Sequence, residues 1–365
     1  MGETDRGKGD SAGLSAAITG SLLGLAVGDA MGLPWEGISR GRQTRFKPDH
    51  DGYRFLFGKG FCSDDTEHAC MTAMALIRSQ GEGDRFSRSL GWRLRFWLMG
   101  LPAGVGMATG KAIIKLWLGF SPVKSGVFSA GNGPAMRAPI LGVAYGENID
   151  TLRDLVRRST RVTHTDPLAE QGALAVALAA AMAFRSGGSV SGEDYLAQLT
   201  GVLRGSGADT FLEAVRGAVE SAGRGEAPHH FAKSLGCDKG VSGYILHTVP
   251  VVLQIWLRFP GDYPRGIREI IALGGDTDTT AAILGGILGA GVGEEGIPEK
   301  WLDEVWEWPR SVVWMRGVAR VLAGRLVGRE ERFPSSGGFL FLPLRNFLFF
   351  IVVLLHGFRR LLPPW

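Results

Sequence analysis

Apolar residues along this chain recur with the spacing of helices. In most segments they fall three and four positions apart, the period of an amphipathic helix, whereas the alternation typical of strands is nearly absent. The sequence therefore predicts an all-α fold. The segments with the helical pattern are residues 12–28, 68–77, 92–99, 110–118, 149–161, 168–184, 195–203, 211–223, 243–257 and 267–273.

The beginning of the chain carries an apolar run behind a polar start. Residues 1–11 are polar and charged, which predicts a disordered N-terminus. Residues 12–28 are apolar and follow Arg6 and Lys8, so a secretory signal is the alternative to a core helix. The run passes into Asp29 without a convincing small-residue cleavage site. We therefore expect a first core helix ending at Gly28, within a domain that spans residues 12–330.

The end of the chain, residues 331–365, is a hydrophobic and basic tail. It is strongly apolar over residues 339–344 and 347–355, and Arg359 and Arg360 follow. The uninterrupted stretch is shorter than the roughly 20 residues that span a bilayer. Packing on the domain, a short tilted span and partner binding are alternatives, and we expect peripheral membrane contact through residues 339–365.

Composition narrows the class of protein. A chain of 365 residues holds one large or two ordinary domains, and 45% apolar with 21% charged residues is ordinary for a globular protein. The 40 basic residues are nearly balanced by 36 acidic ones, which gives no specific nucleic-acid signal. The three cysteines are an odd number without metal-type spacing, so we expect a reducing cytoplasm.

The first motif that carries chemistry is Gly-Gly-Asp-Thr-Asp-Thr at residues 274–279. Its glycines allow a sharp turn and a close approach of the backbone to a ligand. Asp276, Asp278 and Thr279 supply hard oxygens, which suit Mg²⁺, Ca²⁺ or Mn²⁺ better than zinc. Capping of the helix that follows is the alternative interpretation.

A second oxygen cluster, Ser63, Asp64 and Asp65, precedes the helical pattern of residues 68–77. Ser63 would cap that helix, but two adjacent aspartates exceed what capping requires. If the fold joins both motifs, their carboxylates would repel one another unless cations neutralised them. A pair of Mg²⁺ ions, about 3.5–4 Å apart by precedent, is the economical solution.

Other residues have plausible structural roles when each is taken alone. Glu36 lies on a loop punctuated by glycines and reads as a surface acid. Asn132 belongs to a Gly-Asn-Gly turn, His164 lies in a loop, and Tyr244 stands near the start of a helical segment. Arg137 could reach a phosphate or an acid.

Taken in their order along the chain, the motifs resemble those of the ADP-ribosylglycohydrolase family, which contains the dinitrogenase reductase-activating glycohydrolase. The resemblance spans residues 12–306, and Ser63 replaces the commoner threonine without loss of the oxygen. The matching pieces are Gly28-Asp29 with Glu36, Ser63-Asp64-Asp65-Thr66, Gly131-Asn132-Gly133 with Met136-Arg137, Thr163-His164, Gly243-Tyr244, residues 274–279, and Ile297-Pro298 with Trp301.

The resemblance implies a compact bacterial enzyme with two Mg²⁺ ions, or Mn²⁺, beneath an ADP-ribose cleft. The implied metal ligands are Ser63, Asp64, Asp65, Asp276, Asp278 and Thr279. Asn132, His164 and Tyr244 would bind substrate, and Glu36 or Asp65 would transfer a proton. Loops 37–60 and 100–127 would shape the cleft.

The implied activity is Mg²⁺-dependent hydrolysis of the N- or O-glycosidic bond between ADP-ribose and a protein side chain. The alternatives are hydrolysis of a free derivative such as O-acetyl-ADP-ribose, hydrolysis of ADP-ribosylated nucleic acid, and ADP-ribose binding without catalysis. We expect a cytoplasmic protein, peripheral to the inner face of the membrane if its tail makes contact there.

Overall fold

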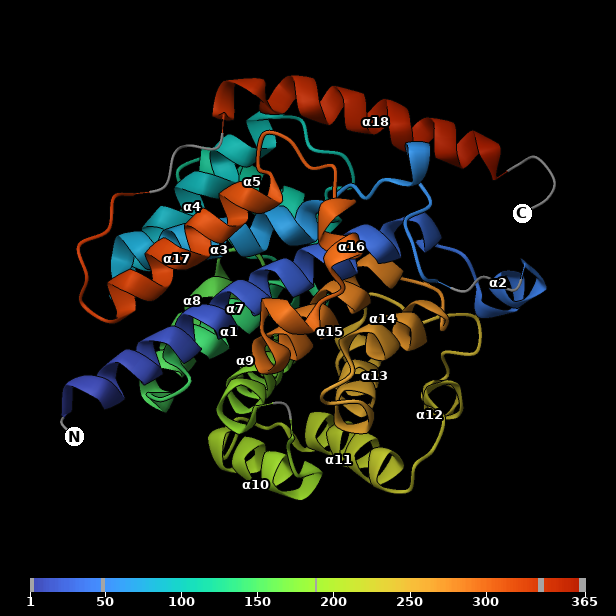
Figure 1. Cartoon of the computed structure of the whole chain (residues 1–365), viewed down its shortest axis with the longest axis horizontal. Coiled ribbons are helices and arrows are strands. Elements are labelled where there is room, and N and C mark those ends of the chain that lie inside the picture. The colour runs from blue at the N-terminus through green and yellow to red at the C-terminus, as the bar shows by residue number, and fades with distance from the viewer. Residues whose placement is uncertain (1–2, 47–49, 188, 334–337, 361–365) are drawn as a thin grey trace.

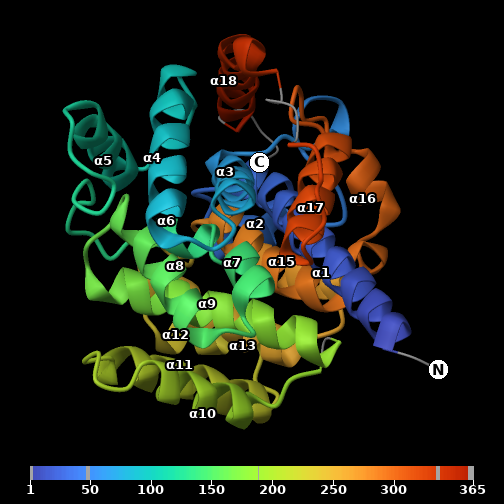
Figure 2. The same ribbon diagram turned by 90° about the vertical axis from the view of Figure 1, so that its left-hand side faces the viewer.

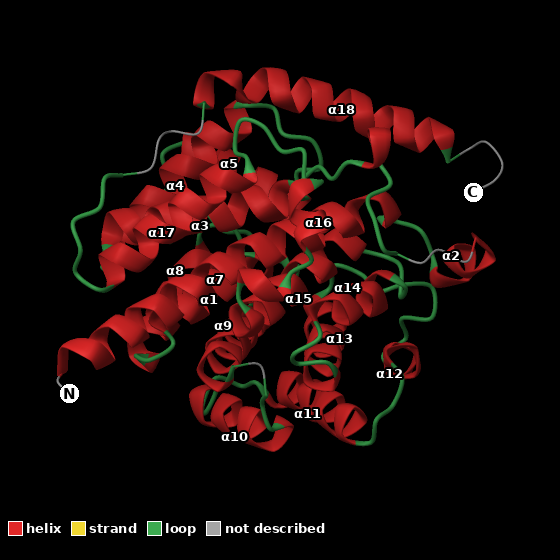
Figure 3. Cartoon of the chain, in the orientation of Figure 1, coloured by secondary structure: helices red, strands yellow, loops and turns green. Residues whose placement is uncertain are grey.

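A computed structural model describes residues 3–46, 50–187, 189–333 and 338–360. Within these ranges the regular structure is helical, and bridges between extended residues occur only singly (Figure 3). The predicted all-α fold is confirmed. Residues 334–337 and 361–365 of the predicted tail lie outside the described ranges.

The helices are α1 (Glu3–Gly32), α2 (Arg40–Phe46), α3 (Asp64–Ser79), α4 (Gly83–Met99), α5 (Met107–Trp117), α6 (Gly133–Met136), α7 (Pro139–Tyr145), α8 (Ile149–Arg161), α9 (Pro167–Ser186), α10 (Gly192–Val202), α11 (Asp209–Gly223), α12 (Pro228–Ser234), α13 (Ile245–Arg258), α14 (Tyr263–Ile271), α15 (Thr277–Val292), α16 (Glu299–Asp303), α17 (Val312–Leu326) and α18 (Leu342–Arg359). Short 3₁₀ turns are η1 (Leu33–Trp35), η2 (Leu56–Gly58), η3 (Glu294–Gly296) and η4 (Phe339–Phe341).

Helix α1 differs from its prediction at both ends. It begins at Glu3 rather than residue 12, and it continues through Gly28 to Gly32. The sequence contains no proline between residues 3 and 32, so nothing interrupts the backbone hydrogen bonds once the helix has formed. The helix is therefore longer at both ends than its pattern predicted, and the disorder predicted for residues 1–11 stays a prediction.

The centre of the molecule is the antiparallel pair α1 and α15. Glycines of α1 spaced four residues apart face small residues of α15, and the two backbones nearly touch. A Cβ added to Gly28 would lie 2.1 Å from the carbonyl oxygen of Ala281. The pairing brings the C-terminal end of α1 beside the first turn of α15, where Thr277 Oγ1 donates to the carbonyl of Gly32 at 2.8 Å.

The remaining helices surround this pair. Helices α9, α13 and α14 pack on α15, while α3, α7 and α17 pack on α1. Helices α10 and α11 form an outer layer on α9 and α13 (Figures 1 and 2). The glycine-lined part of α1, residues 20–32, is therefore buried, and the loops at its end are held from several sides.

Helix α18 packs across one side of the molecule, over the N-terminal end of α3 (Figures 1 and 2). Its inner face is anchored by Arg345, whose guanidinium donates to both carboxylate oxygens of Glu307 at 2.8 and 2.6 Å. Asn346 Nδ2 donates to the carbonyl of Gly100 at 2.7 Å. Buried polar residues therefore attach this helix to the core, which is the packed alternative stated for the tail, and the domain boundary at residue 330 stays a prediction.

Candidate active site

Helix α3 begins at the acidic cluster predicted from the sequence. Ser63 is its N-cap and accepts from the backbone N–H of Asp65. Beneath it Asp29, buried in α1, accepts from the backbone N–H groups of Ser63 and Thr66 and from the hydroxyl of Thr66. Asp29 was not among the predicted site residues, although it stands in a glycine-flanked acidic motif that matched the family.

The two predicted motifs meet at Asp65. Its Oδ2 accepts from the hydroxyl of Ser63 and from the hydroxyl of Thr279, each at 3.1 Å. Asp65 is fully buried, so it lies behind these hydroxyls and does not line the cavity in front of them. Asp65 therefore lies beneath the site, and the roles predicted for Asp65 and Glu36 in proton transfer stay predictions.

A cavity of about 400 Å³ opens in front of the two motifs. It gathers most of the predicted residues, and it also involves the glycine-rich part of the expected loop 100–127. No residue of the expected loop 37–60 contributes to the lining of this cavity as described. The residues that line it are Leu33, Glu36, Ser63, Asp64, Ala103, Gly104, Gly106, Met107, Ala108, Thr109, Ser129, Gly131, Asn132, Gly133, Met136, His164, Asp276, Asp278, Thr279, Phe349 and Val353.

The loop that carries Glu36 is fixed to the glycine pair of the first motif. The N–H of Gly37 donates to the carbonyl of Gly275, and the N–H of Gly275 donates to the carbonyl of Ile38. Gly275 has φ +88°, and a Cβ there would meet the Val241 carbonyl at 2.1 Å. Only glycine fits this crossing, so the pair sets the position of both acidic segments.

Negative charge accumulates in the cavity. Burial raises the pKa values of Asp64, Asp65 and Asp278 well above the usual value for a carboxyl, and neighbouring carboxylates raise them further. Partial burial and the charge of Asp276 raise the pKa of Glu36, which Arg360 opposes. Burial also raises the pKa of Asp29 to about 6, against the effect of its hydrogen bonds.

Two of these acids retain unused oxygens. Among the described residues, Asp65 Oδ1 and Asp278 Oδ1 are buried without a hydrogen-bond partner. A buried carboxylate oxygen without a donor is costly unless a cation satisfies it. The donor chemistry, hard oxygens from carboxylates and hydroxyls, therefore fits Mg²⁺ or Mn²⁺.

The arrangement is not a closed metal cage. Across the described ranges, no three His, Cys, Asp or Glu side chains already form a metal-binding group. Four of the six predicted ligands are aspartates, and their carboxylates are not gathered closely enough to form such a group. The fit to a cation thus rests on the unsatisfied oxygens and their repulsion rather than on preformed coordination geometry.

The predicted substrate residues have different positions. Asn132 lines the cavity and its Nδ2 donates to Asp276 Oδ2 at 2.7 Å, which orients that carboxylate. His164 lines it too, and burial together with the charge of Arg137 lowers its pKa to about 3, so the imidazole is neutral. Tyr244 is 40% exposed and does not line the cavity, so its contact with substrate stays a prediction.

Arg137 has a structural role. It is fully buried, donates to the Ser159 carbonyl and the Thr163 hydroxyl at 2.7 Å each, and contacts His68 Nδ1 at 3.3 Å. Its contacts fix the segment that carries His164. The interpretation of Arg137 as a phosphate ligand is not supported by this position.

Helix α18 supplies part of the cavity wall. Phe349 and Val353 line the cavity from its inner face, and Arg360 at its C-cap donates to the carbonyls of Glu36 and Pro34. The sequence marked this segment as apolar but contained no signal for its place over the site, since the contacts join residues more than 300 positions apart.

The sequence of this chain is similar to that of a known protein family. A sequence model of the ADP-ribosylglycohydrolase family matches residues 10–333. The chain belongs to the ADP-ribosylglycohydrolase family. It is therefore an enzyme of a family of hydrolases that cleave ADP-ribose linkages.

Individual proteins similar to this chain also carry ADP-ribosylglycohydrolase or ADP-ribosylhydrolase names. The ADP-ribosyl-[dinitrogen reductase] glycohydrolase of Rhodospirillum rubrum is 26% identical over 78% of this chain and 89% of its own length. The ADP-ribosylhydrolase ARH3 of Bos taurus is 30% identical over 50% of this chain and 56% of its own length. A solved structure, an ADP-ribosylglycohydrolase-related protein complex, is 30% identical, with a TM-score of 0.64 over 86% of this chain and 99% of its own.

Proposed function

We propose that this ADP-ribosylglycohydrolase is a Mg²⁺-dependent enzyme that cleaves the glycosidic bond between ADP-ribose and a modified protein side chain. The observation that carries the proposal is the group of carboxylates around one cavity, with buried oxygens on Asp65 and Asp278 that lack donors. The names of the R. rubrum and ARH3 relatives support an ADP-ribosyl conjugate as the substrate.

Different residues of the site would bind the metal ions, orient a ligand and transfer a proton. Ser63, Asp64, Asp65, Asp276, Asp278 and Thr279 would hold two Mg²⁺ ions, which when bound polarise ribose hydroxyls and acidify a water. Asn132 holds Asp276 in place through its 2.7 Å hydrogen bond. Glu36, whose pKa is raised, would give a proton to the leaving side chain. Carboxylates facing the anomeric carbon favour oxocarbenium character there.

The linkage is tested with a panel of substrates in saturating Mg²⁺. ADP-ribose release is measured from Arg-linked and Ser-linked ADP-ribosylated proteins and compared with hydrolysis of O-acetyl-ADP-ribose. We expect at least one protein conjugate to be cleaved faster than O-acetyl-ADP-ribose. Hydrolysis of the free derivative alone would contradict a protein substrate, and tight ADP-ribose binding without release would indicate a non-catalytic binder.

We also propose that the outer face of α18 contacts a membrane surface from the cytoplasmic side. Helices α1, α9 and α18 are each long and apolar enough to cross a membrane, but α1 and α9 are mostly buried in the fold, whereas α18 is only 28% buried. Its outer face exposes Phe347, Leu355 and Phe358 by 61%, 57% and 64%. An apolar helix face with a basic end is typical of an interfacial anchor.

Sedimentation with anionic vesicles tests the membrane contact. Replacing Phe347, Leu355 and Phe358 by serine should abolish co-sedimentation while leaving thermal stability unchanged, because these side chains are exposed. Val313→Ser, at an apolar residue of α17 that is 72% exposed, is the matched control. The membrane contact would be contradicted if the triple variant and Val313→Ser lost co-sedimentation equally, or if the unmodified chain did not bind the vesicles.

A further inference from the structure

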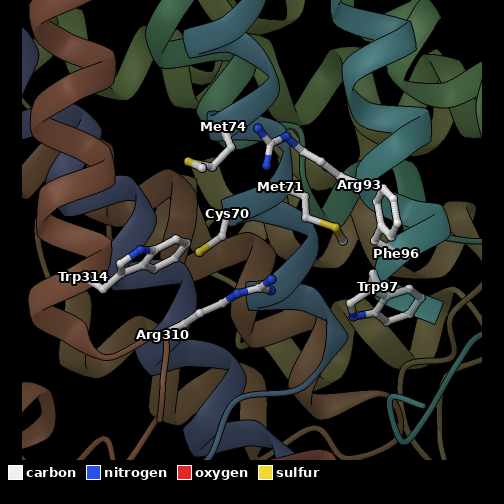
Figure 4. Close-up of a pocket in the computed structure, with 8 residues that line it drawn as sticks. All are labelled: Cys70, Met71, Met74, Arg93, Phe96, Trp97, Arg310 and Trp314. Atoms are coloured by element: carbon white, nitrogen blue, oxygen red, sulfur yellow. The ribbon is translucent and has the colours of Figure 1, made fainter. Parts of the chain in front are cut away.

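A second cavity lies away from the catalytic one, between α3, α4 and the start of α17. Its volume is about 320 Å³. Figure 4 shows the side chains around it, with the guanidinium groups of Arg93 and Arg310 entering from different elements. The other lining residues are apolar or contain sulfur, namely Cys70, Met71, Met74, Phe96, Trp97 and Trp314.

The two arginines leave positive charge without an anion. Arg310 donates to Glu67 Oε1 at 3.3 Å, and the same carboxylate accepts from the indole N–H of Trp97 at 2.6 Å. Arg93 has no ion pair with any described residue, and its guanidinium carbon lies 5.8 Å from the centre of the Phe333 ring. The charge of Arg310 is thus paired with Glu67, and the charge of Arg93 is left without a described carboxylate.

Burial makes this arrangement costly. Among the described residues, Arg93 Nε and Arg310 Nε are buried without acceptors. Burial, together with repulsion from Arg310 and Arg78, lowers the pKa of Arg93 to about 10. An anion in the cavity would offset the repulsion between the two guanidiniums and offer an acceptor to donors that lack one.

We propose that this cavity binds the carboxylate of a medium-length aliphatic acid. The single uncompensated charge fits a monoanion better than a phosphate dianion. The methionines Met71 and Met74 and the rings of Trp97 and Trp314 fit a flexible apolar chain, since methionine adapts its shape to different ligands. The volume lies at the low end of the range for small-molecule sites, which fits an acid of about ten carbons.

Calorimetric titration of the full chain tests the site with three probes below their aggregation limits. Decanoate carries the charge and the chain, 1-decanol carries the chain alone, and acetate carries the charge alone. We expect decanoate to bind about tenfold or more tightly than decanol, and acetate not to bind measurably, because a charged hydrogen bond and apolar burial both contribute. Equal affinities for decanoate and decanol would overturn the proposal.

Substitutions locate the binding. Arg93→Met should weaken decanoate binding about tenfold and leave decanol unchanged, and Arg93→Lys should restore part of the difference. Arg93 forms no hydrogen bond with a described residue that the change would break, so the fold should persist. Arg88→Met, at an exposed arginine of the same helix, is the matched control. Decanoate binding that survives Arg93→Met would place the acid elsewhere, such as on the outer face of α18, and overturn the proposal.

Discussion

Replacing Asp278 by asparagine should make the metal-free protein more stable. Asp278 is 6% exposed, and its Oδ1 has no partner among the described residues. Burial, Glu36, Asp276 and Asp65 all raise its pKa, so its charge is costly in the folded state at neutral pH. Asparagine keeps the shape of the side chain, removes its charge and adds an amide N–H that can donate a hydrogen bond to a neighbouring carboxylate.

The size of the effect follows from the cost of an unsatisfied buried group. Relieving it should stabilise the protein by about 1–3 kcal/mol. In domains of 150–250 residues, each kcal/mol of stability shifts Tm by about 2–4 °C, and the lower value applies to this longer chain. We therefore expect Tm to rise by about 2–6 °C. Thermal unfolding is measured in EDTA at pH 8.

The stability of the protein should also depend on pH and on metal. Because the folded-state pKa of Asp278 lies above its unfolded value, wild-type stability in EDTA falls as pH rises through that interval. The advantage of Asp278→Asn should therefore shrink at pH 5. Added Mg²⁺ at a hundredfold excess over Kd should increase the free energy of unfolding of the wild type by about 2.7 kcal/mol and so raise its Tm. The Tm of the variant should rise much less.

Asp303→Asn, at an exposed acid of α16, is the matched control and should leave Tm unchanged under all conditions. An Asp278→Asn protein that is less stable than wild type in EDTA at pH 8 would refute the argument from buried charge. Equal Mg²⁺ stabilisation of both proteins would refute the assignment of Asp278 as a ligand.

Three further changes test other parts of the structure. Asp29→Ala should destabilise the EDTA-treated protein by about 2–3 kcal/mol in urea unfolding, opposite in sign to Asp278→Asn, because it strands the donors of Ser63 and Thr66. Arg345→Met should leave the buried carboxylate of Glu307 unpaired, cost about 3–5 kcal/mol, and speed amide exchange in α18. Phe349→Ala should raise KM for the ADP-ribosylated substrate more than it lowers kcat, because it removes cavity wall without touching the acids.

The fold class and most of the site could be predicted because both leave local signals. Helical periodicity marked most of the helices, and oxygen-rich clusters at two helix starts marked Ser63, Asp64, Asp276 and Thr279, which line one cavity. Glu36 reads as a surface acid in isolation, and only the family pattern connected it to the site.

Other features depend on contacts between distant residues. Asp65 looks like its neighbour in the sequence, but the step of about 100° between adjacent helical residues directs it behind the cavity, where two hydroxyls donate to it. Arg137 has the chemistry of a phosphate ligand, and its burial against Ser159 and Thr163 gives it a different role. The place of α18 over the cavity follows from the buried Arg345–Glu307 pair, which neither residue reveals alone.

Release of ADP-ribose from an ADP-ribosylated protein, in a titration of EDTA and then of Mg²⁺, tests the central claim most directly. The account predicts release in Mg²⁺, its loss in EDTA and its recovery when Mg²⁺ is restored. It also predicts no release by Asp278→Asn under any of these conditions and normal release by Asp303→Asn. Release that continues in EDTA, or that persists in Asp278→Asn, would contradict a Mg²⁺ centre built from these carboxylates.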